Sequence, residues 1–207
     1  MNIIIFGATG NAGKHLVKQA LEKGHEVTAF SRNAQSPGIN HPQLKIWQGN
    51  VLSAVDVADS VKGKDVILCA LGAGRKGVVR SEGTLNIIKG MKKHGIKRLV
   101  CQTTLGCGDS KGNLDFFWKY IMFGWFLKAA FLDHELQEKY IIESNLDWTI
   151  VRPGAFTDGE ITRKFKSGFS ATDKNIKLKI SKADLAYFML NQVDDEKSIG
   201  KAISLSY

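Results

Sequence analysis

The chain has 207 residues, of which 43% are hydrophobic and 24% are charged, and its formal net charge is +9. These values exclude a disordered or fibrous chain, and the length suits one domain that buries about 70% of the surface its unfolded form exposes. The basic residues are scattered, so we expect the positive charge to favour anionic small molecules and not nucleic acid.

Short β-branched or aromatic runs alternate with stretches of helical spacing from the first residue onward. The predicted strands span residues 2–6, 26–30, 44–47, 65–70, 98–103 and 148–152. After Pro153 the pattern gives a glycine-rich loop, a strand at 176–180, a helix at 182–193 and a last strand near 201–206. Strands that are apolar along their length indicate a sheet covered on both faces. The sequence therefore predicts an α/β fold, a Rossmann-type doubly wound parallel sheet with helices on both faces.

The opening run MNIIIFG lacks the basic lead and the small-residue cleavage site of a secretory signal, so we expect a cytoplasmic protein. Cys69, Cys101 and Cys107 contain no C-x-x-C pair, and we expect reduced thiols. No cluster of His, Cys and carboxylate residues has metal-ligand spacing, so no metal site is predicted.

The glycine-rich stretch GATGNAG follows the first predicted strand directly and opens a helix. Gly7 permits the tight turn, Gly10 lets the backbone approach a pyrophosphate, and Gly13 lets the helix pack closely on the strand. The spacing departs by one position from the dinucleotide fingerprint G-x-G-x-x-G, but the strand-turn-helix context supports a dinucleotide site. We expect residues 1–207 to form a single NAD(P)-binding domain, with small C-terminal elements from about residue 153 on the substrate side.

The end of the second predicted strand indicates which dinucleotide binds. NAD sites usually place an Asp or Glu there to hold the ribose 2′-hydroxyl. This chain has Ser31 and Arg32 instead, and an arginine can pair with a 2′-phosphate. The sequence therefore predicts NADP(H) as the cofactor.

Four stretches carry a family resemblance: IIIFGATGNAG, QGNVLSAVDVADSVKGKDVILCALG, SEGTLNIIKGMKKHGIKRLV and ESNLDWTIVRPG. They resemble the atypical short-chain dehydrogenase/reductases of the NmrA-like kind. The chain length and the late stretch ISKADLAYFML look most like the NADPH-dependent flavin reductases, also called biliverdin-IXβ reductases. The similarity covers nearly the whole chain and is weakest at 107–133 and 155–175.

The resemblance implies a role for each matching residue. The glycine loop Gly7, Thr9, Gly10, Asn11, Ala12 and Gly13 would hold the pyrophosphate, and Ser31 and Arg32 would hold the 2′-phosphate. Asn50 and Val51 would flank the adenine, and Leu71 and Gly72 would border the ribose near the nicotinamide. Pro153, Gly154 and Ala155 would line the nicotinamide, and Thr103 matches a strand-end threonine of the family and would also contact the cofactor. The chain departs from the family at Asn50 (usually Asp), at Thr104 (Ser) and at Ala155 (His).

No tyrosine in this chain has a lysine four positions later, because Gly124, Ser144 and Asn191 occupy those places. A ketone reduced by hydride needs a positioned acid, whereas a conjugated acceptor spreads the incoming charge and takes its proton from water. The sequence therefore favours an NADPH-dependent reductase of a flavin, a linear tetrapyrrole such as biliverdin, or a quinone. The alternative is a non-catalytic NADP-binding sensor or regulator of the NmrA type, which docks on a partner protein.

Two side chains are candidates for a catalytic role. Thr104 matches the strand-end hydroxyl of the flavin reductases, although it could simply cap the strand. His134 occupies the place where related isoflavone-type reductases carry a catalytic lysine, and Glu138, one turn later, is expected to orient it. A lone helical histidine is also a common packing residue.

Residues 116–132, FFWKYIMFGWFLKAAFL, form the most aromatic stretch of the chain. The stretch is too short and too charged for a confident membrane span. It could be a core helix, a lid over a flat substrate, or a surface for a partner or a membrane interface. Its place after the fifth strand favours the lid over the interface, so membrane contact is not expected. We also expect a monomer or a weak dimer.

Overall fold

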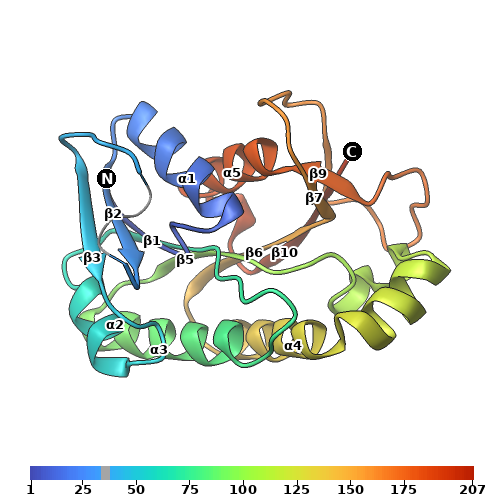
Figure 1. Ribbon diagram of the computed structural model, residues 1–207, viewed down its shortest axis with the longest axis horizontal. Coiled ribbons are helices and arrows are strands. Elements are labelled where there is room, and N and C mark those ends of the chain that lie inside the picture. Colours follow the sequence, from blue (N-terminus) through green and yellow to red (C-terminus); the bar gives the residue numbers. More distant parts are fainter. Residues whose placement is uncertain (34–37) are drawn as a thin grey trace.

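The computed structural model describes residues 1–33 and 38–207, and its centre is an eight-stranded sheet (Figure 1). The strands lie in the order β3-β2-β1-β4-β5-β6-β10-β8, and all neighbours are parallel except β10 and β8. Their bounds are β1 Asn2–Phe6, β2 Glu26–Ser31, β3 Leu44–Gln48, β4 Val66–Cys69, β5 Arg98–Gln102, β6 Asp147–Pro153, β8 Lys166–Ser167 and β10 Lys201–Ser206. The predicted doubly wound parallel sheet is confirmed.

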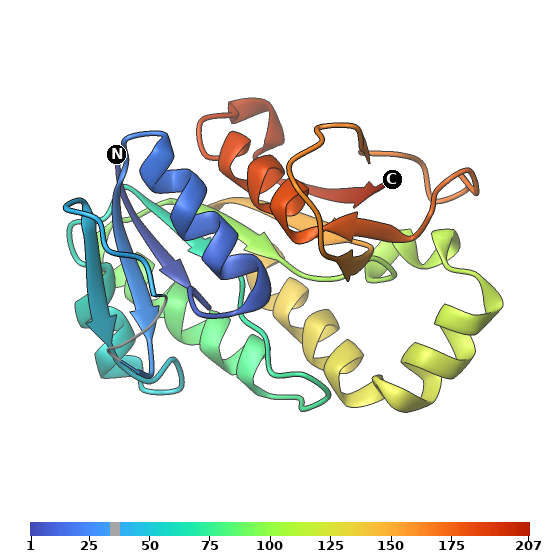
Figure 2. The same cartoon turned by 45° about the horizontal axis from the view of Figure 1, so that its top comes forward.

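Helices cover both faces of this sheet (Figures 1 and 2). Helices α1 and α5 pack on one face, and α2, α3 and α4 pack on the other. Their bounds are α1 Asn11–Glu22, α2 Ala54–Val61, α3 Val79–His94, α4 Lys128–Ile142 and α5 Lys182–Asn191. The short helices η1 (Gly108–Asn113) and η3 (Glu196–Ser198) lie in connections.

The alternation of side chains along β1 supplies both halves of the core. Ile3 and Ile5 pack against α1 and α5, whereas Ile4 and Phe6 pack against α2 and α3. All four side chains are fully buried. A strand with two buried faces must be apolar at every position, which is why the sequence pattern identified the sheet so well.

The segment after Pro153, expected to form small elements on the substrate side, also contributes to the main sheet and its helical layers. Strand β10 extends the main sheet beside β6, and α5 packs on α1. Strands β7 (Ala155–Thr157) and β9 (Lys179–Ser181) form a separate two-stranded parallel sheet. The strand expected at 176–180 is therefore shorter and later than predicted, and the helix expected to reach 193 ends at Asn191.

The aromatic stretch is not a core helix. Residues Phe117–Phe126 form η2, a π-helix in which no residue is buried, and α4 begins at Lys128. Both views show η2 projecting from the body beyond the end of the sheet (Figures 1 and 2). Within the described residues, no helix combines the length and the apolar character needed to cross a bilayer.

Candidate functional site

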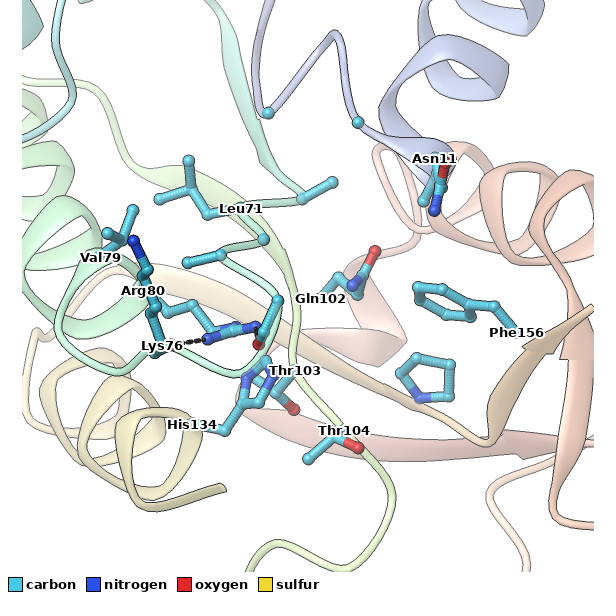
Figure 3. A pocket seen from close by; sticks show the side chains of 18 of the residues that line it. Asn11, Leu71, Lys76, Val79, Arg80, Gln102, Thr103, Thr104, His134 and Phe156 are labelled. Carbon is cyan, nitrogen blue, oxygen red and sulfur yellow. Dashed lines mark hydrogen bonds between the residues drawn. The ribbon is translucent and has the colours of Figure 1, made fainter. Parts of the chain in front are cut away.

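A cavity of about 960 Å³ lies at the carboxyl ends of the central strands (Figure 3). Turns that follow β1, β2, β4, β5 and β6 border it, and η2 and α4 contribute to one side. The strand order reverses between β1 and β4, and open α/β sheets bind ligands at such a point. The volume is at the upper end of the usual range for small-molecule sites, about 300–1,000 Å³. This cavity is the candidate functional site.

The turn between β1 and α1 forms one end of the cavity. Gly7 has a φ of +81°, and a Cβ there would lie 2.2 Å from the carbonyl oxygen of Ala70. A Cβ at Gly13 would lie 2.0 Å from the carbonyl oxygen of Gly7, so α1 approaches the turn this closely only because residue 13 has no side chain. Of the six predicted loop residues, Gly13 does not line the cavity and acts through this packing. The five that line it are Gly7, Thr9, Gly10, Asn11 and Ala12.

The N-terminus of α1 is open toward the cavity. Its N-cap is Gly10, no side chain caps it, and its first turn contains no acidic residue. The first N–H groups of the helix and the positive end of its dipole are therefore left for an anion.

The end of β2 brings Ser31 and Arg32 to the same cavity. Ser31 is buried and its hydroxyl accepts a hydrogen bond from the backbone N–H of Asn33 at 3.2 Å, whereas the Arg32 side chain is exposed. Lys76 also lines the cavity, as does Arg80, whose charge is shared with the buried Asp133 at 3.4 Å, and no Asp or Glu is found among the described lining residues. The site is therefore electrostatically suited to an anionic ligand.

The two pairs expected beside the adenine and the ribose also line the cavity. The side-chain oxygen of Asn50 accepts the backbone N–H of Leu52 at 3.1 Å, so it holds its own turn. Val51 and Leu71 pack closely on α3, because a Cβ at Gly83 of this helix would lie 2.9 Å from each of them. Gly72, the residue after Leu71, also lines the cavity.

Residues Pro153, Gly154 and Ala155 line the cavity where β6 continues into β7. The N–H groups of Gly154 and Ala155 donate to the carbonyl oxygens of Leu205 and Leu178, at 2.9 and 2.8 Å. These bonds fix the backbone at this edge of the cavity.

The residues present fit a dinucleotide. A glycine cradle that has no room for a Cβ, an uncapped helix N-terminus, and a lining with cations and no carboxylate suit the two phosphates of a pyrophosphate. A further polar atom could accept a hydrogen bond from a ligand: Gln102 Oε1 is buried and has no hydrogen bond within the described part of the chain.

Comparison with known proteins agrees with this geometry. Residues 7–196 match the model of a protein family described as NAD(P)H-binding. The chain belongs to this family. NAD(P)(H) is accordingly its cofactor, and the resemblance to the atypical short-chain dehydrogenase/reductases is confirmed.

Three proteins are similar to this chain in fold or in sequence. The oxidoreductase YlbE of Lactococcus lactis is 25% identical, with a TM-score of 0.84 over 99% of this chain and 90% of that chain. The anaerobillin reductase ChuY of Escherichia coli O157:H7 shares the fold, at 24% identity and a TM-score of 0.83 over 99% and 96%. The photosystem II assembly factor Ycf39 of a Synechocystis species is 26% identical over 78% of this chain, which spans only 47% of Ycf39.

The carboxyl end of β5 places two threonines at the cavity, as predicted. Thr103 is buried, and its hydroxyl donates to Glu138 Oε1 at 2.6 Å. The carboxylate of Glu138 is held in turn by Arg152, at 3.0 and 2.7 Å, and Arg152 also pairs with Asp109. Thr104 is half-buried, and within the described residues its hydroxyl has only a 3.4 Å contact to the carbonyl oxygen of Leu105. Of the two threonines, Thr104 is therefore the one whose hydroxyl remains available to a ligand.

His134 lines the cavity near Thr103 and Thr104, but Glu138 does not orient it (Figure 3). The expected i, i+4 pair is wrong because Glu138 is held by Thr103 and Arg152. The partner of His134 is Gln137, whose Oε1 lies 3.0 Å from the histidine Nδ1.

The hydrogen bonds of Gln137 define the protonation of His134. Gln137 Nε2 donates to Thr84 Oγ1 at 2.9 Å and to Cys101 Sγ at 3.3 Å, so its Oε1 is the atom that faces His134. An oxygen acceptor requires a proton on Nδ1, which leaves Nε2 of the neutral ring as an acceptor. Burial lowers the pKa of His134 to about 4, with a further contribution from the Arg80 charge. At neutral pH this histidine can accept a hydrogen bond but does not supply a proton.

Several lining residues escaped the sequence prediction. Gln102 points into the cavity on the side where Asn11 and Phe156 lie, Lys76 comes from the connection between β4 and α3, and Arg80 comes from the first turn of α3 (Figure 3). The Arg80 guanidinium donates to the carbonyl oxygens of Lys76 and Gly74, both at 2.9 Å, and so holds this connection together. The available signal was the basic, glycine-rich stretch GAGRKG directly after the fourth strand, which must lie at the carboxyl edge.

The aromatic stretch contributes one wall of the cavity. Trp118, Phe123 and Leu127 line it, and Phe123 stacks on Phe131 with ring centroids 4.7 Å apart. Across the cavity mouth, the guanidinium of Arg75 lies 5.5 Å from the ring centroid of Phe126. The β4–α3 connection and η2 therefore touch each other beside the cavity.

Proposed function

We propose that the protein is an NADPH-dependent oxidoreductase that transfers hydride to a conjugated acceptor, such as a flavin, a linear tetrapyrrole or a quinone. Membership of the NAD(P)H-binding family and the likeness to oxidoreductase folds support the general class. The observation that carries the acceptor class is the lining of the cavity, which combines an aromatic wall with the complete absence of tyrosine among its described residues.

The bound dinucleotide would supply the hydride, and the residues of the chain would supply position. The glycine turn and α1 would hold the pyrophosphate, and Pro153, Gly154 and Ala155 would border the nicotinamide. Trp118 and Phe123 would hold a flat acceptor by stacking, in a setting where proximity and orientation lower the barrier. Thr104 would donate a hydrogen bond to an acceptor oxygen or nitrogen.

The proton would come from water in this proposal. His134 is neutral and lacks a proton on the nitrogen available to the cavity, and no carboxyl group is among the described lining residues. A conjugated acceptor tolerates this because the added charge is spread over several heteroatoms, whereas the alkoxide of a simple ketone would not. A purified sample that oxidises NADPH with none of FMN, riboflavin, biliverdin and a quinone would contradict the proposal.

The preference for NADPH over NADH is tested at Arg32. We expect Arg32→Ala to raise the KM for NADPH by an amount worth about 1.5–3 kcal/mol, because a hydrogen-bonded charge is lost from the 2′-phosphate. The KM for NADH should stay nearly constant, and Lys45→Ala, an exposed cation on β3 outside the cavity, should change neither value. Equal effects of Arg32→Ala on both cofactors would reject the phosphate assignment.

The missing proton donor also favours a second candidate, a non-catalytic NADP sensor of the NmrA type. Such a protein would bind the oxidised and the reduced dinucleotide with similar affinity and would turn over no acceptor. The acceptor screen therefore separates the two functions, since any turnover that Thr104→Val lowers rules out the sensor.

A further inference from the structure

The outward side of η2 carries an exposed group of large apolar side chains. Trp125 is 75% exposed and Phe116 is 72% exposed, the highest values among the exposed large hydrophobic residues. The group, which we call the aromatic face, consists of Phe116, Phe117, Tyr120, Ile121, Trp125 and Phe126. Contiguous apolar surface of this kind marks an interaction site in a folded protein.

The aromatic face is separate from the cavity wall, although one helix carries both. Trp118, Phe123 and Leu127 point to the cavity, whereas of the face only Phe126 has a contact across the cavity mouth, with Arg75. The remaining ring contacts of the face are local, such as Phe116 with Tyr120 at 5.0 Å and Trp125 with Phe126 at 4.8 Å. Neither the core nor the proposed acceptor site accounts for the exposure of these rings.

The charges around the face are mostly positive. Residues 116–132 contain Lys119 and Lys128 and no Asp or Glu, and the ammonium of Lys119 lies 5.3 Å from the ring centroid of Tyr120. None of the salt bridges within the described residues includes Arg75, Lys119 or Lys128. The nearest exposed acidic residues in the sequence are Asp115 before the stretch and Glu135 after it.

This combination identifies the kind of partner. Trp, Tyr and Phe beside unpaired lysines are the side chains that lie at a lipid–water interface, where the rings enter the headgroup region and the cations meet anionic lipid. A second copy of the chain fits less well, because a twofold contact would bring the same lysines of both copies onto one patch with no acidic residue inside it. The projection of η2 from the body also leaves it free to reach a surface (Figure 2).

We propose that the aromatic face is a peripheral docking site for an anionic membrane surface. The rings insert to the depth of the headgroups without spanning the bilayer, and Lys119 and Lys128 add electrostatic attraction. This reverses the sequence expectation of no membrane contact, because the sequence pattern could not tell which rings face the cavity and which face outward. The proposal is independent of the reductase assignment.

The test is co-sedimentation of the full chain with vesicles. Wild-type protein is expected to bind vesicles of phosphatidylcholine mixed with phosphatidylglycerol, to bind pure phosphatidylcholine much less, and to lose binding as salt is raised. The double variant Phe116→Ser/Trp125→Ser should lower the partition coefficient about tenfold or more, because both rings leave the interface. Val55→Ser, which alters an equally exposed apolar residue (69%) on α2, should leave binding unchanged.

A second pair of double variants tests the electrostatic contribution to vesicle binding. Lys119→Gln/Lys128→Gln should weaken binding to anionic vesicles about fivefold for each lysine, the factor equivalent to about 1 kcal/mol per basic residue. Lys89→Gln/Lys93→Gln, which removes two exposed lysines from α3, should have a much smaller effect.

Three results would overturn the docking site. They are equal binding of the aromatic variant and wild type, no preference for anionic lipid, and a stable dimer in light scattering that Phe116→Ser/Trp125→Ser dissociates. Titration with NADP⁺ checks that each variant is folded. An inactive enzyme that still binds vesicles would contradict the reductase proposal alone.

Discussion

Gln102 is the residue whose environment points most directly to a ligand. Its side chain is only 7% exposed, and its Oε1 is buried without a hydrogen-bond partner in the described structure. A buried unpaired polar atom costs about 1–3 kcal/mol. We therefore expect Gln102→Leu to raise the free energy of unfolding of the ligand-free protein by about 1 kcal/mol and to weaken NADP⁺ or acceptor binding about tenfold.

Urea unfolding and ligand titration measure the two effects of Gln102→Leu separately. Gln19→Leu is the matched control, since Gln19 is equally buried but its amide donates to the carbonyl oxygen of Ala183 at 3.0 Å. That variant should lose stability and keep ligand affinity. A stability loss in both variants, with no change in binding, would show that Gln102 has only a packing role.

His134 predicts a specific loss of stability in mild acid. Burial lowers its pKa from 6.5 to about 4 in the folded protein, so from pH 7.5 to pH 5 the unfolded chain takes up a proton that the folded protein does not. Protonation thus favours the unfolded state, and stability should fall by about 2 kcal/mol over this range. His134→Gln should lack this part of the loss in urea unfolding at the two pH values, while His25 titrates alike in both proteins. An equal loss in both proteins would place the histidine outside the buried site.

At the scale of one element, the β1–α1 turn separates packing from ligand binding. A Cβ at Gly13 would lie 2.0 Å from the carbonyl oxygen of Gly7, whereas a Cβ at Gly10 would lie 3.2 Å from the same atom with no other contact within 4 Å. Gly13→Ala should therefore lower the free energy of unfolding by about 2 kcal/mol or more. Gly10→Ala should change stability by less than about 1 kcal/mol and still weaken dinucleotide binding, because its methyl group meets the pyrophosphate.

Thermal unfolding and NADP⁺ titration distinguish these two glycines. If both variants lost stability equally, Gly10 would have a structural role in addition to bordering the cavity. If Gly10→Ala bound NADP⁺ normally, the pyrophosphate would lie elsewhere.

Which elements were predictable depends on how local their cause is. The strands and the glycine turn were predicted because buried strands and a strand–turn–helix motif are recorded in adjacent residues. The partner of Glu138 was mispredicted because helical spacing offered His134, whereas tertiary packing of α4 on β5 and β6 gave it Thr103 and Arg152. The two-sided character of η2 could not be predicted, since every position of η2 is apolar or aromatic apart from Lys119 and Gly124.

At the scale of the whole molecule, the cavity has two halves that differ in how local their origin in the sequence is. The dinucleotide half is built from turns that each follow one strand, so each could be assigned from its own motif. The acceptor half joins the β4–α3 connection, η2, α4 and β7, which lie far apart in sequence and meet only through the strand order. Gln102 and Phe156 can be recognised as cavity residues only once the fold has brought those segments together.

The two halves should therefore respond separately to ligands in hydrogen–deuterium exchange. NADP⁺ alone is expected to slow exchange in the β1–α1 turn and in residues 50–52, because these segments border the dinucleotide end. Adding a flat acceptor such as FMN should slow exchange in η2 as well, since Trp118 and Phe123 would then pack on a ligand. The last turns of α3, which lead to the amino end of β5, serve as the internal control and should not change beyond the general stabilisation by binding, about 2.7 kcal/mol at a hundredfold excess over Kd. If η2 exchanged at the same rate with and without the acceptor, the aromatic wall would not be part of the acceptor site, and the proposed substrate class would lose its structural basis.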